Sequence, residues 1–355
     1  MRRIALRVVT VFSLALAFAL ADPAGAQPFG GFLTSSGYPG ASQYVQIPHS
    51  ADLNPTDAFT FEAWVAISNN PPSEDCRSIA GKDFMRAWWI GVCTVGGKPT
   101  LRSYLKGGSS SKNGGVIPAG EWTHVAVVFD GTQRKHYING EMVFAVDESG
   151  PLTTSTGEMR IGGDVSWQRT QTGAIDEVRL WSVARSQSDL RFWINRTLPG
   201  TPPGLVGYWK LDGGPADALG AHDGTNQGAV YLTSPVAAAC TPTATSLCLY
   251  DRFTVAVKWR DLAGVVSDGH VVPGVGTAQS GLLYFIAPDN WELLAKLVDG
   301  CGLNSRYWVF VSGSTELFYK LSITDVTSGV NKIYFSYGGT NPPAITDTDA
   351  FAVCP

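Results

Sequence analysis

Short runs of β-prone residues, separated by turn residues, recur along the chain from Tyr44 onward, and this pattern constrains the fold most strongly. In the run 59–67 every second side chain is apolar, which places five of them on one face: Phe59, Phe61, Ala63, Val65 and Ile67. Asn139-Gly140 separates two further runs and favours the type I′ turn of a β-hairpin. One short helix is expected after Ser186, because Ser186 and Asp189 resemble a capping box. The sequence therefore predicts an all-β protein.

The first 26 residues have the pattern of a secretory signal peptide. Three arginines precede an apolar run of about 14 residues (8–21), and Ala24-Gly25-Ala26 forms a small-residue cleavage pattern. The apolar run is shorter than the roughly 20 residues of a membrane-spanning helix, and no later segment is apolar enough to span a membrane. We therefore expect cleavage before Gln27 and a secreted protein, either extracellular or periplasmic.

The composition divides the remaining chain into two parts. Residues 234–245 (SPVAAACTPTAT) read as a linker, and a second strand-rich block follows them. A chain of 355 residues makes two domains the natural expectation. We predict a signal peptide at 1–26, a first sandwich at 30–234, a linker at 235–246, and a second, smaller antiparallel β-sandwich at 247–355.

Charge and cysteine content bound the partners and the compartment. Removing residues 1–26 takes away three arginines and one aspartate, which changes the formal net charge from −4 to −6. Without a basic cluster, such a chain is a poor match for nucleic acid or anionic lipid. Six cysteines in an exported chain predict three disulfides. A hairpin turning near residue 84 would pair Cys76 with Cys93. The other four allow three pairings, of which Cys240–Cys248 with Cys301–Cys354 is preferred.

A set of motifs between residues 37 and 232 is similar to one known family. They are FTFEAWV (59–65), GEWTHVAVVFDG (120–131), HYINGEMV (136–143), MRIGGD (159–164), GAIDEVRLWSVARS (173–186) and GLVGYWKLDG (204–213). In order and spacing they resemble a laminin-G-like jelly roll of the concanavalin A-like lectin/glucanase group. The resemblance implies two facing antiparallel sheets, often with a calcium ion, and often the binding of glycans or glycoproteins. Residues 239–355 resemble a β domain that recurs at the C-termini of exported bacterial proteins, through motifs such as LCLYDRFTVAVKW (247–259).

No catalytic motif is evident. Retaining glucanases of this fold need two carboxylates about 5–5.5 Å apart, which means acids two or four positions apart on a strand. Glu62 stands alone in its strand, and the adjacent Asp176 and Glu177 should face opposite sides of theirs. The chain has no G-x-S-x-G elbow, no H-E-x-x-H helix and no phosphate-binding Gly-rich loop. We therefore predict that the protein is not an enzyme.

Two polar loops are the best candidates for a binding site. Pentraxins, which are relatives of this fold, take calcium ligands from two loops at equivalent places. By that resemblance loops 68–76 and 163–172 would supply the metal ligands Asn70, Glu74, Asp75 and Asp164. In the second loop Trp167 could stack on a sugar, with Arg169 and Gln171 beside it. Trp88 and Trp89 point to opposite sides, so only one can be core, and Trp88 is taken as the ligand candidate. The alternative is a pair of ordinary polar loops.

Three functions remain open from the sequence. The first is a glycan- or cell-surface-binding protein, lectin-like or adhesin-like, with calcium assisting and a glycan or glycoprotein surface as partner. The second is a non-catalytic structural or assembly protein of the envelope or matrix. The third and least favoured is a glycoside hydrolase. Asn195-Arg-Thr197 is in addition a formal N-glycosylation sequon.

Overall fold

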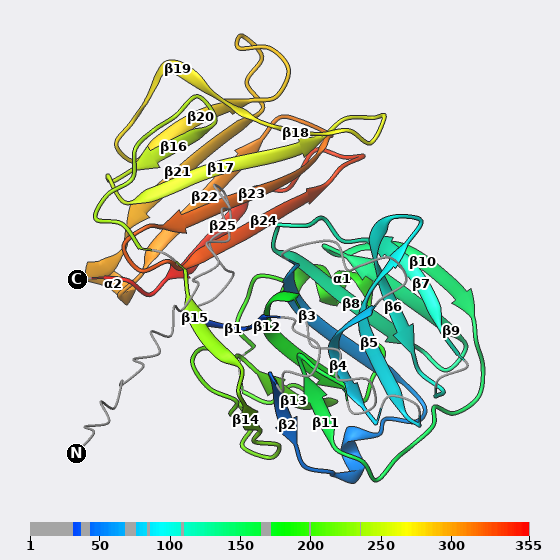
Figure 1. Ribbon diagram of the computed structural model, residues 1–355. Helices are drawn as coiled ribbons and strands as arrows, with labels where there is room; N and C mark the ends of the chain where they lie inside the picture. The colour runs from blue at the N-terminus through cyan, green and yellow to red at the C-terminus, as the bar shows by residue number, and fades with distance from the viewer. Residues whose placement is uncertain are drawn as a thin grey trace, which may run out of the picture.

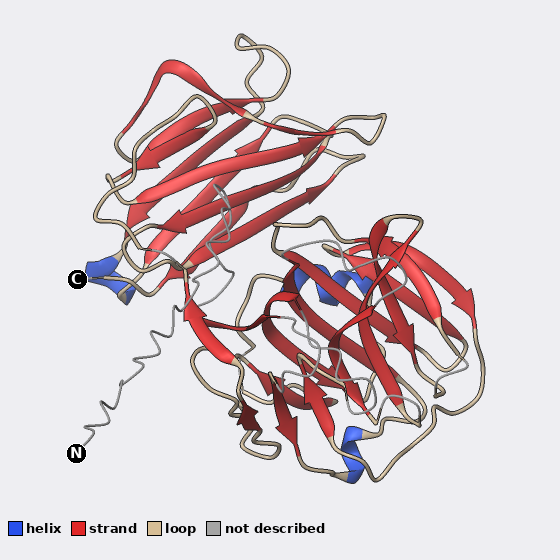
Figure 2. Cartoon of the chain, viewed as in Figure 1, coloured by secondary structure: helices blue, strands red, loops and turns tan. Residues whose placement is uncertain are grey.

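Strands form nearly all of the regular structure in the computed structural model, which describes residues 31–36, 43–67, 76–83, 86–107, 110–164, 172–198, 200–234 and 236–354. They build four sheets with antiparallel pairing, arranged as two sandwiches (Figures 1 and 2). The predicted all-β fold is confirmed. Within the described residues, no helix has the length and apolar character needed to cross a membrane.

The first sandwich contains sheets that we name A and B. Sheet A has eight strands, which in spatial order, with β13 beside β12, are β10 (Glu141–Asp147), β9 (Gln133–Ile138), β8 (Thr123–Phe129), β3 (Phe59–Ile67), β12 (Thr172–Trp181), β1 (Gly31–Ser36), β15 (Val230–Thr233) and β13 (Leu205–Trp209). Sheet B has seven: β14 (Thr225–Gln227), β2 (Tyr44–Ile47), β11 (Met159–Ile161), β4 (Cys76–Lys82), β5 (Trp88–Val95), β6 (Lys98–Tyr104) and β7 (Lys112–Val116). Helix η1 (Ala51–Leu53) follows β2, and α1 (Gln187–Trp193) follows β12.

Alternation along β3 sets the core between these sheets. The five apolar residues predicted to share a face (Phe59, Phe61, Ala63, Val65 and Ile67) are all buried in the main core. The side chains between them, Glu62 and Trp64 among them, belong to the outer face of sheet A. Helix α1 begins with the predicted capping box, because Ser186 and Asp189 bond each other's backbone amides.

The second sandwich contains sheets C and D and has a core of its own. Sheet C runs β16 (Ser246–Leu249), β17 (Phe253–Arg260), β23 (Phe318–Asp325) and β24 (Asn331–Tyr337), with β18 (Val266–Asp268) beside β17. Sheet D runs β19 (His270–Thr277), β20 (Ser280–Tyr284), β21 (Leu293–Asp299), β22 (Tyr307–Gly313) and β25 (Ile345–Phe351), and α2 (Cys301–Asn304) precedes β22. All three predicted disulfides are present: Cys76–Cys93, Cys240–Cys248 and Cys301–Cys354.

The outer face of sheet C packs against the outer face of sheet A (Figure 1). Phe335 of β24 stacks on Trp64 of β3, with ring centroids 6.4 Å apart. The Asn195 side-chain amide donates to the Ile333 carbonyl over 2.8 Å. Arg260 forms a bidentate pair with Glu141, at 2.8 and 2.9 Å. The second sandwich therefore covers part of the first through both apolar and charged contacts.

Candidate functional site

The two loops predicted to bind a ligand start and end at neighbouring points of the first sandwich. Ile67, the last residue of β3, pairs with Gly173 of β12. Near the end of the first loop and the start of the second, the Ser78 hydroxyl of β4 donates to the Gly163 carbonyl over 2.9 Å. Segments 68–75 and 165–171 therefore leave the described structure at one rim of the sandwich. The residues between the anchors, including the predicted Asn70, Glu74, Asp75, Trp167, Arg169 and Gln171, lie outside the described residues.

Asp164 is the one predicted metal ligand that the structure describes. It lies directly after the Gly163 anchor and is only 2% exposed. Its backbone carbonyl accepts a 2.8 Å bond from Arg160, whose guanidinium sits 4.1 Å from the centre of the Tyr44 ring. Within the described ranges, no three His, Cys, Asp or Glu side chains come together in a way that could hold a metal ion.

The assignment of Trp88 to a ligand-binding face is wrong. Trp88 is 1% exposed and belongs to the main core, where its ring meets the edge of Phe59 at a centroid distance of 5.3 Å. Its indole N–H donates to the Leu53 carbonyl. Trp88 and Trp89 do point to opposite sides of β5, as strand alternation requires, but the outward residue is Trp89. The sequence could not decide between them because both faces of β5 are apolar.

Trp89 marks a part of the outer face of sheet B that sequence reasoning missed. It packs with Tyr104 and the Cys76–Cys93 bridge, and its ring occupies space that a side chain at Gly81 or Gly91 would need. Gly81 lies opposite Trp89 on β4, and Gly91 lies two positions after Trp89 on β5. These two glycines were the signal in the sequence that could have indicated a large outward side chain here. The disulfide and the indole ring both pack on β4, the strand that follows the first of the two polar loops.

A second cluster of charged residues lies on the outer face of sheet A. The register between β3 and β12 shifts between Asp176 and Arg179, and Glu177 takes a left-handed backbone conformation with φ of 52°. This bulge leaves Asp176 opposite Trp64 and Arg179 opposite Glu62, while Glu177 bonds Arg179 at 2.7 Å. The expectation that the two adjacent acids face opposite sides is therefore wrong, because strand alternation fails at a bulge.

The carboxylates of this cluster differ in their electrostatics. Burial would raise the pKa of Glu62, but a hydrogen bond from His124 and the charge of Arg179 hold it below its usual value. Burial, together with the charges of Glu177 and Asp212, raises the pKa of Asp176 well above its usual value. A pair of carboxyls with different protonation is what acid–base catalysis requires, so access to the pair decides what it can do.

The cluster is closed to substrate in this arrangement. Glu62, Asp176 and Glu177 are each at most 3% exposed. Arg179 donates to the carbonyls of Trp193 and Arg196, which ties the end of α1 and the following turn down over the cluster. The geometry therefore supports a structural ion network rather than a glycosidase site.

A Ser–His pair inside the first sandwich is equally inaccessible. The His136 Nε2 lies 2.8 Å from the Ser103 hydroxyl, and both side chains are fully buried. Burial and, to a smaller extent, the nearby Arg134 charge lower the pKa of His136 to about 4. No carboxylate orients the ring, because its Nδ1 faces the Gly114 carbonyl. The pair lacks both the third member and the access that a nucleophilic triad requires.

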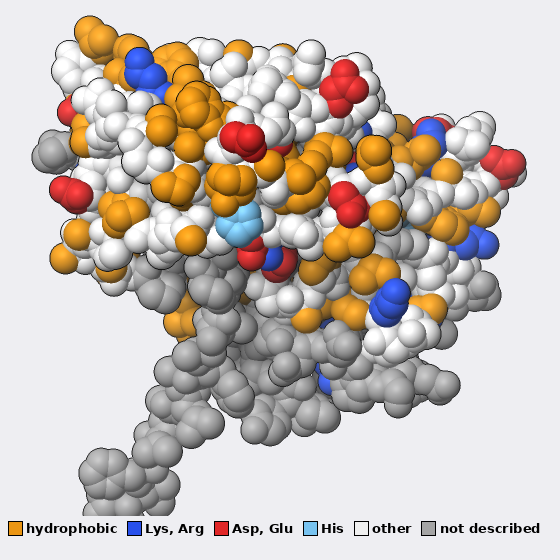
Figure 3. All heavy atoms as spheres, turned by 90° about the horizontal axis from the view of Figure 1, so that it is seen from above, with side chains coloured by type: hydrophobic (Ala, Val, Ile, Leu, Met, Phe, Trp, Pro, Cys, Tyr) orange, Lys and Arg blue, Asp and Glu red, His pale blue; other side chains and the backbone are white. Residues whose placement is uncertain are grey.

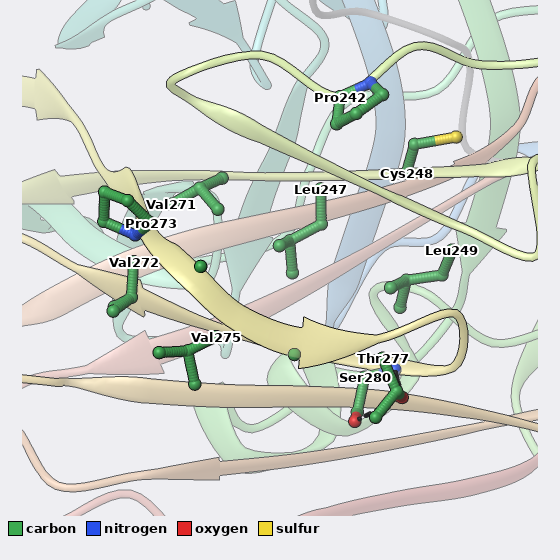
Figure 4. A pocket seen from close by; sticks show the side chains of 12 residues that line it. Pro242, Leu247, Cys248, Leu249, Val271, Val272, Pro273, Val275, Thr277 and Ser280 are labelled. Carbon is green, nitrogen blue, oxygen red and sulfur yellow. Dashed lines mark hydrogen bonds between the residues drawn. The ribbon is translucent and has the colours of Figure 1, made fainter.

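An open groove of about 290 Å³ lies in the second sandwich between β16 and β19 (Figure 4). Apolar side chains dominate its wall, including Leu247 of β16 and Val271, Val272 and Val275 of β19. None of its lining residues is charged, and its polar side chains Thr277 and Ser280 bond each other. The groove therefore offers little to orient a polar ligand.

Comparisons with known proteins agree with the fold of the first sandwich. Residues 39–191 match a laminin-G-type family model described as the concanavalin A-like lectin/glucanases superfamily. Pappalysin-1 of Mus musculus is 29% identical over 168 residues, which cover 41% of this chain, and the human protein is 27% identical over the same length. The chain spans only a tenth of the length of these relatives.

Solved structures of jelly-roll proteins are similar at lower identity. A provisionally assigned carbohydrate binding protein from Bacteroides ovatus aligns with 58% of this chain and 60% of its own, at 24% identity and a TM-score of 0.47. Domain 4 of a GH43 extracellular arabinanase from Geobacillus stearothermophilus, in complex with arabinotriose, aligns with 46% of this chain and 87% of its own, at 23% identity and a TM-score of 0.35. A SAP-like pentraxin from Limulus polyphemus covers 45% and 80% at 15% identity and a TM-score of 0.36.

Proposed function

We propose that the chain is a secreted, non-catalytic protein that binds glycans or glycoprotein surfaces. The premise is that its first sandwich matches the concanavalin A-like lectin/glucanases superfamily. Its three disulfides and the leader-like N-terminus support secretion. The closed carboxylate cluster supports the absence of catalysis, since a hydrolase would need those acids within reach of a sugar.

The observation that carries this proposal is the common rim of the two polar loops. Their described ends are joined by the Ile67–Gly173 pairing and the Ser78–Gly163 hydrogen bond. These contacts support the proposal that residues from both loops act on one ligand, although the loops lie about 95 positions apart in the chain. The Cys76–Cys93 bridge joins β4, the strand that follows the first loop, to β5.

Within this site we assign two sets of residues. Trp167 would stack on a sugar ring, with Arg169 and Gln171 donating to its hydroxyls. Asp75 and Asp164 would share a calcium ion with help from Glu74 and Asn70, because calcium takes six to eight oxygen ligands. The position of Asp164 directly after the Gly163 anchor, at the described edge of the rim, supports its inclusion in this set.

The test separates calcium from sugar. Calcium at 100 times its Kd should stabilise the folded chain by about 2.7 kcal/mol and raise its melting temperature. Asp164→Asn keeps the shape of the side chain and should abolish that rise. Trp167→Ala should weaken retention on a glycan array while the calcium response stays. Phe192→Ala, which removes an exposed ring on α1, is the matched control.

Two outcomes would contradict the proposal. A chain that binds no glycan on the array, with or without chelator, but forms a stable complex with an envelope or matrix protein would favour the structural or assembly function. Glycan binding that is insensitive to chelator and unchanged in Asp164→Asn would remove calcium from the site and leave sugar recognition in place.

A further inference from the structure

The outer face of sheet D carries a narrow band of side chains, apolar except for one lysine, that nothing in the described chain covers. Its residues alternate with the core residues of β20, β21 and β22, and all are partly or fully exposed. We call this band the Trp308 strip, and it consists of Leu282, Tyr284, Leu294, Lys296, Val298, Trp308 and Phe310. Viewed from above, the second sandwich shows hydrophobic side chains gathered across this side with few charges among them (Figure 3).

The opposite face of the same sandwich shows what happens to such a surface when protein covers it. On sheet C the rings of Phe335 and Tyr337 also point outward, and both meet the first sandwich. Two cations of sheet C at that interface have acidic partners on the first sandwich: Lys258 lies 3.1 Å from Glu121, and Arg260 pairs with Glu141. Contact with the first sandwich therefore covers the rings of sheet C, whereas the described contacts of the sheet D rings lie within their own sandwich: Tyr284 stacks on His270, and Trp308 meets Phe310 edge to face.

Trp308 is held in place without being part of the core. Its indole N–H donates to the Asn304 side chain over 2.8 Å. The ring fills the space above Gly300, where an added Cβ would come within 2.3 Å of indole atoms. The Cys301–Cys354 bridge anchors the short helix that supplies Asn304. An aromatic ring fixed in this way loses little entropy when a ligand contacts it.

The shape of the strip favours a linear ligand. Leu282, Leu294 and Ser312 lie opposite one another on β20, β21 and β22, and so do Ser280, Lys296 and Phe310. With strands about 4.8 Å apart and about 3.3 Å per residue, the strip measures roughly 10 Å by 20 Å. The strip is thus about twice as long as it is wide, which matches the shape of a linear ligand.

The charge of the strip indicates the class of ligand. Lys296 lies on the middle strand of sheet D and is the one charged residue among the outward positions of β20, β21 and β22. No carboxylate of the described residues forms an ion pair with it, in contrast to Lys258 and Arg260 on sheet C. A second copy of this face would bring two lysines together, so self-association is disfavoured.

From these observations we infer that the Trp308 strip binds a linear acidic polysaccharide, with ring faces of Tyr284, Phe310 and Trp308 against the sugars and Lys296 against a carboxylate of the polymer. Aromatic area supplies the apolar contact, and the ammonium supplies a charge-assisted bond that a neutral polymer cannot offer. The site lies on the second sandwich and is independent of the loop rim on the first.

Biolayer interferometry on the full chain tests this inference, with biotinylated polygalacturonate and hyaluronate as probes and dextran as the neutral control. The wild type should bind at least one of the two acidic polymers about tenfold more tightly than dextran, a difference of about 1.4 kcal/mol, because only an acidic polymer offers Lys296 a charge-assisted hydrogen bond. Lys296→Gln should remove that preference, and Phe310→Ala should weaken binding to the same polymer by a similar factor.

Matched controls keep the result specific. Lys98→Gln removes an exposed lysine from the first sandwich, and Phe192→Ala removes an exposed ring from α1; neither should change binding. Binding by Trp308→Ala is compared with wild type only if the two proteins have the same melting temperature. If the variant melts earlier, the conclusion is drawn from Lys296→Gln alone.

The possible outcomes distinguish the two sites. Equal binding to all three polymers, no binding to either acidic polymer, or unchanged binding in Lys296→Gln would overturn the inference while leaving the loop site untouched. Loss of acidic-polymer binding in Lys296→Gln, with no effect of Asp164→Asn or chelator, would support the strip alone. Loss in Asp164→Asn with Lys296→Gln unaffected would place the only sugar contact on the first sandwich.

Discussion

His136 should make the folded protein sensitive to mild acid. Its ring is fully buried between the two sheets of the first sandwich. The Gly114 carbonyl can only accept, so Nδ1 carries the ring proton and Nε2 accepts from the Ser103 hydroxyl. Arg134 donates to the same hydroxyl over 3.2 Å. A second proton on the ring would end the bond that Ser103 donates and place a cation beside a buried guanidinium.

The magnitude follows from the two pKa values. Burial lowers the pKa of His136 in the folded chain to about 4, compared with 6.5 for an ordinary histidine. Between these values the unfolded chain binds the proton and the folded chain does not, so acid favours unfolding. At 1.36 kcal/mol per pH unit the full penalty is about 3 kcal/mol, and about 2 kcal/mol of it should accumulate between about pH 7.5 and about pH 5.

Urea unfolding at several pH values measures this penalty. His136→Gln retains hydrogen-bonding groups but does not titrate. It should be less stable than wild type near neutral pH, yet its free energy of unfolding should fall by about 2 kcal/mol less on the way to pH 5. His270→Gln, which changes a partly exposed ring on sheet D, is the control. The reasoning fails if wild type and His136→Gln lose the same free energy over this range.

Three further predictions concern stability and the interface between the sandwiches. Replacing both Cys76 and Cys93 by serine should lower the free energy of unfolding by about 2–4 kcal/mol in urea titrations, and no loss would show that the bridge constrains little. A double-mutant cycle of Glu141→Ala and Arg260→Ala should give a coupling energy of about 0.5–1 kcal/mol, and zero coupling would argue against their contact in solution. When the chain is secreted by a eukaryotic host, molecules glycosylated at Asn195 should be cleaved between the sandwiches by elastase, which cuts after small residues such as those of the linker, far faster than Asn195→Gln, because the sugar would replace the bond to Ile333; equal cleavage rates would refute this.

Local sequence patterns correctly predicted most of the fold. The alternation in β3 identified its core face, and equal distances from a turn identified the Cys76–Cys93 pair. The motifs between residues 37 and 232 gave the superfamily of the first sandwich, which the family model over 39–191 supports. Each of these inferences depends on neighbours within one strand or hairpin, or on motifs in a fixed order, and such information is present in the sequence itself.

Inferences that depended on which side of a strand faces the core were less secure. Trp88 and Trp89 differ in no way that the sequence records, and the inward one is decided by the register of β4 and β5. At Asp176 and Glu177 the alternation rule itself fails, since the bulge adds a residue that no propensity scale predicts. Both errors concerned a candidate ligand or catalytic residue, which shows why site residues need more than strand patterns.

The contact between the sandwiches could not be read from either half of the sequence alone. Sheets C and D both present aromatic rings and cations on their outer faces, so β24 and β22 look alike in pattern. The two sheets differ in the ion pairs that their outward cations form. Glu121 and Glu141 of the first sandwich pair with cations of sheet C, while Lys296 of sheet D forms no ion pair with a carboxylate of the described residues. A covered sheet face is thus distinguished from an open one by its charge pairing, and that criterion makes the open face of sheet D the place to look for a ligand.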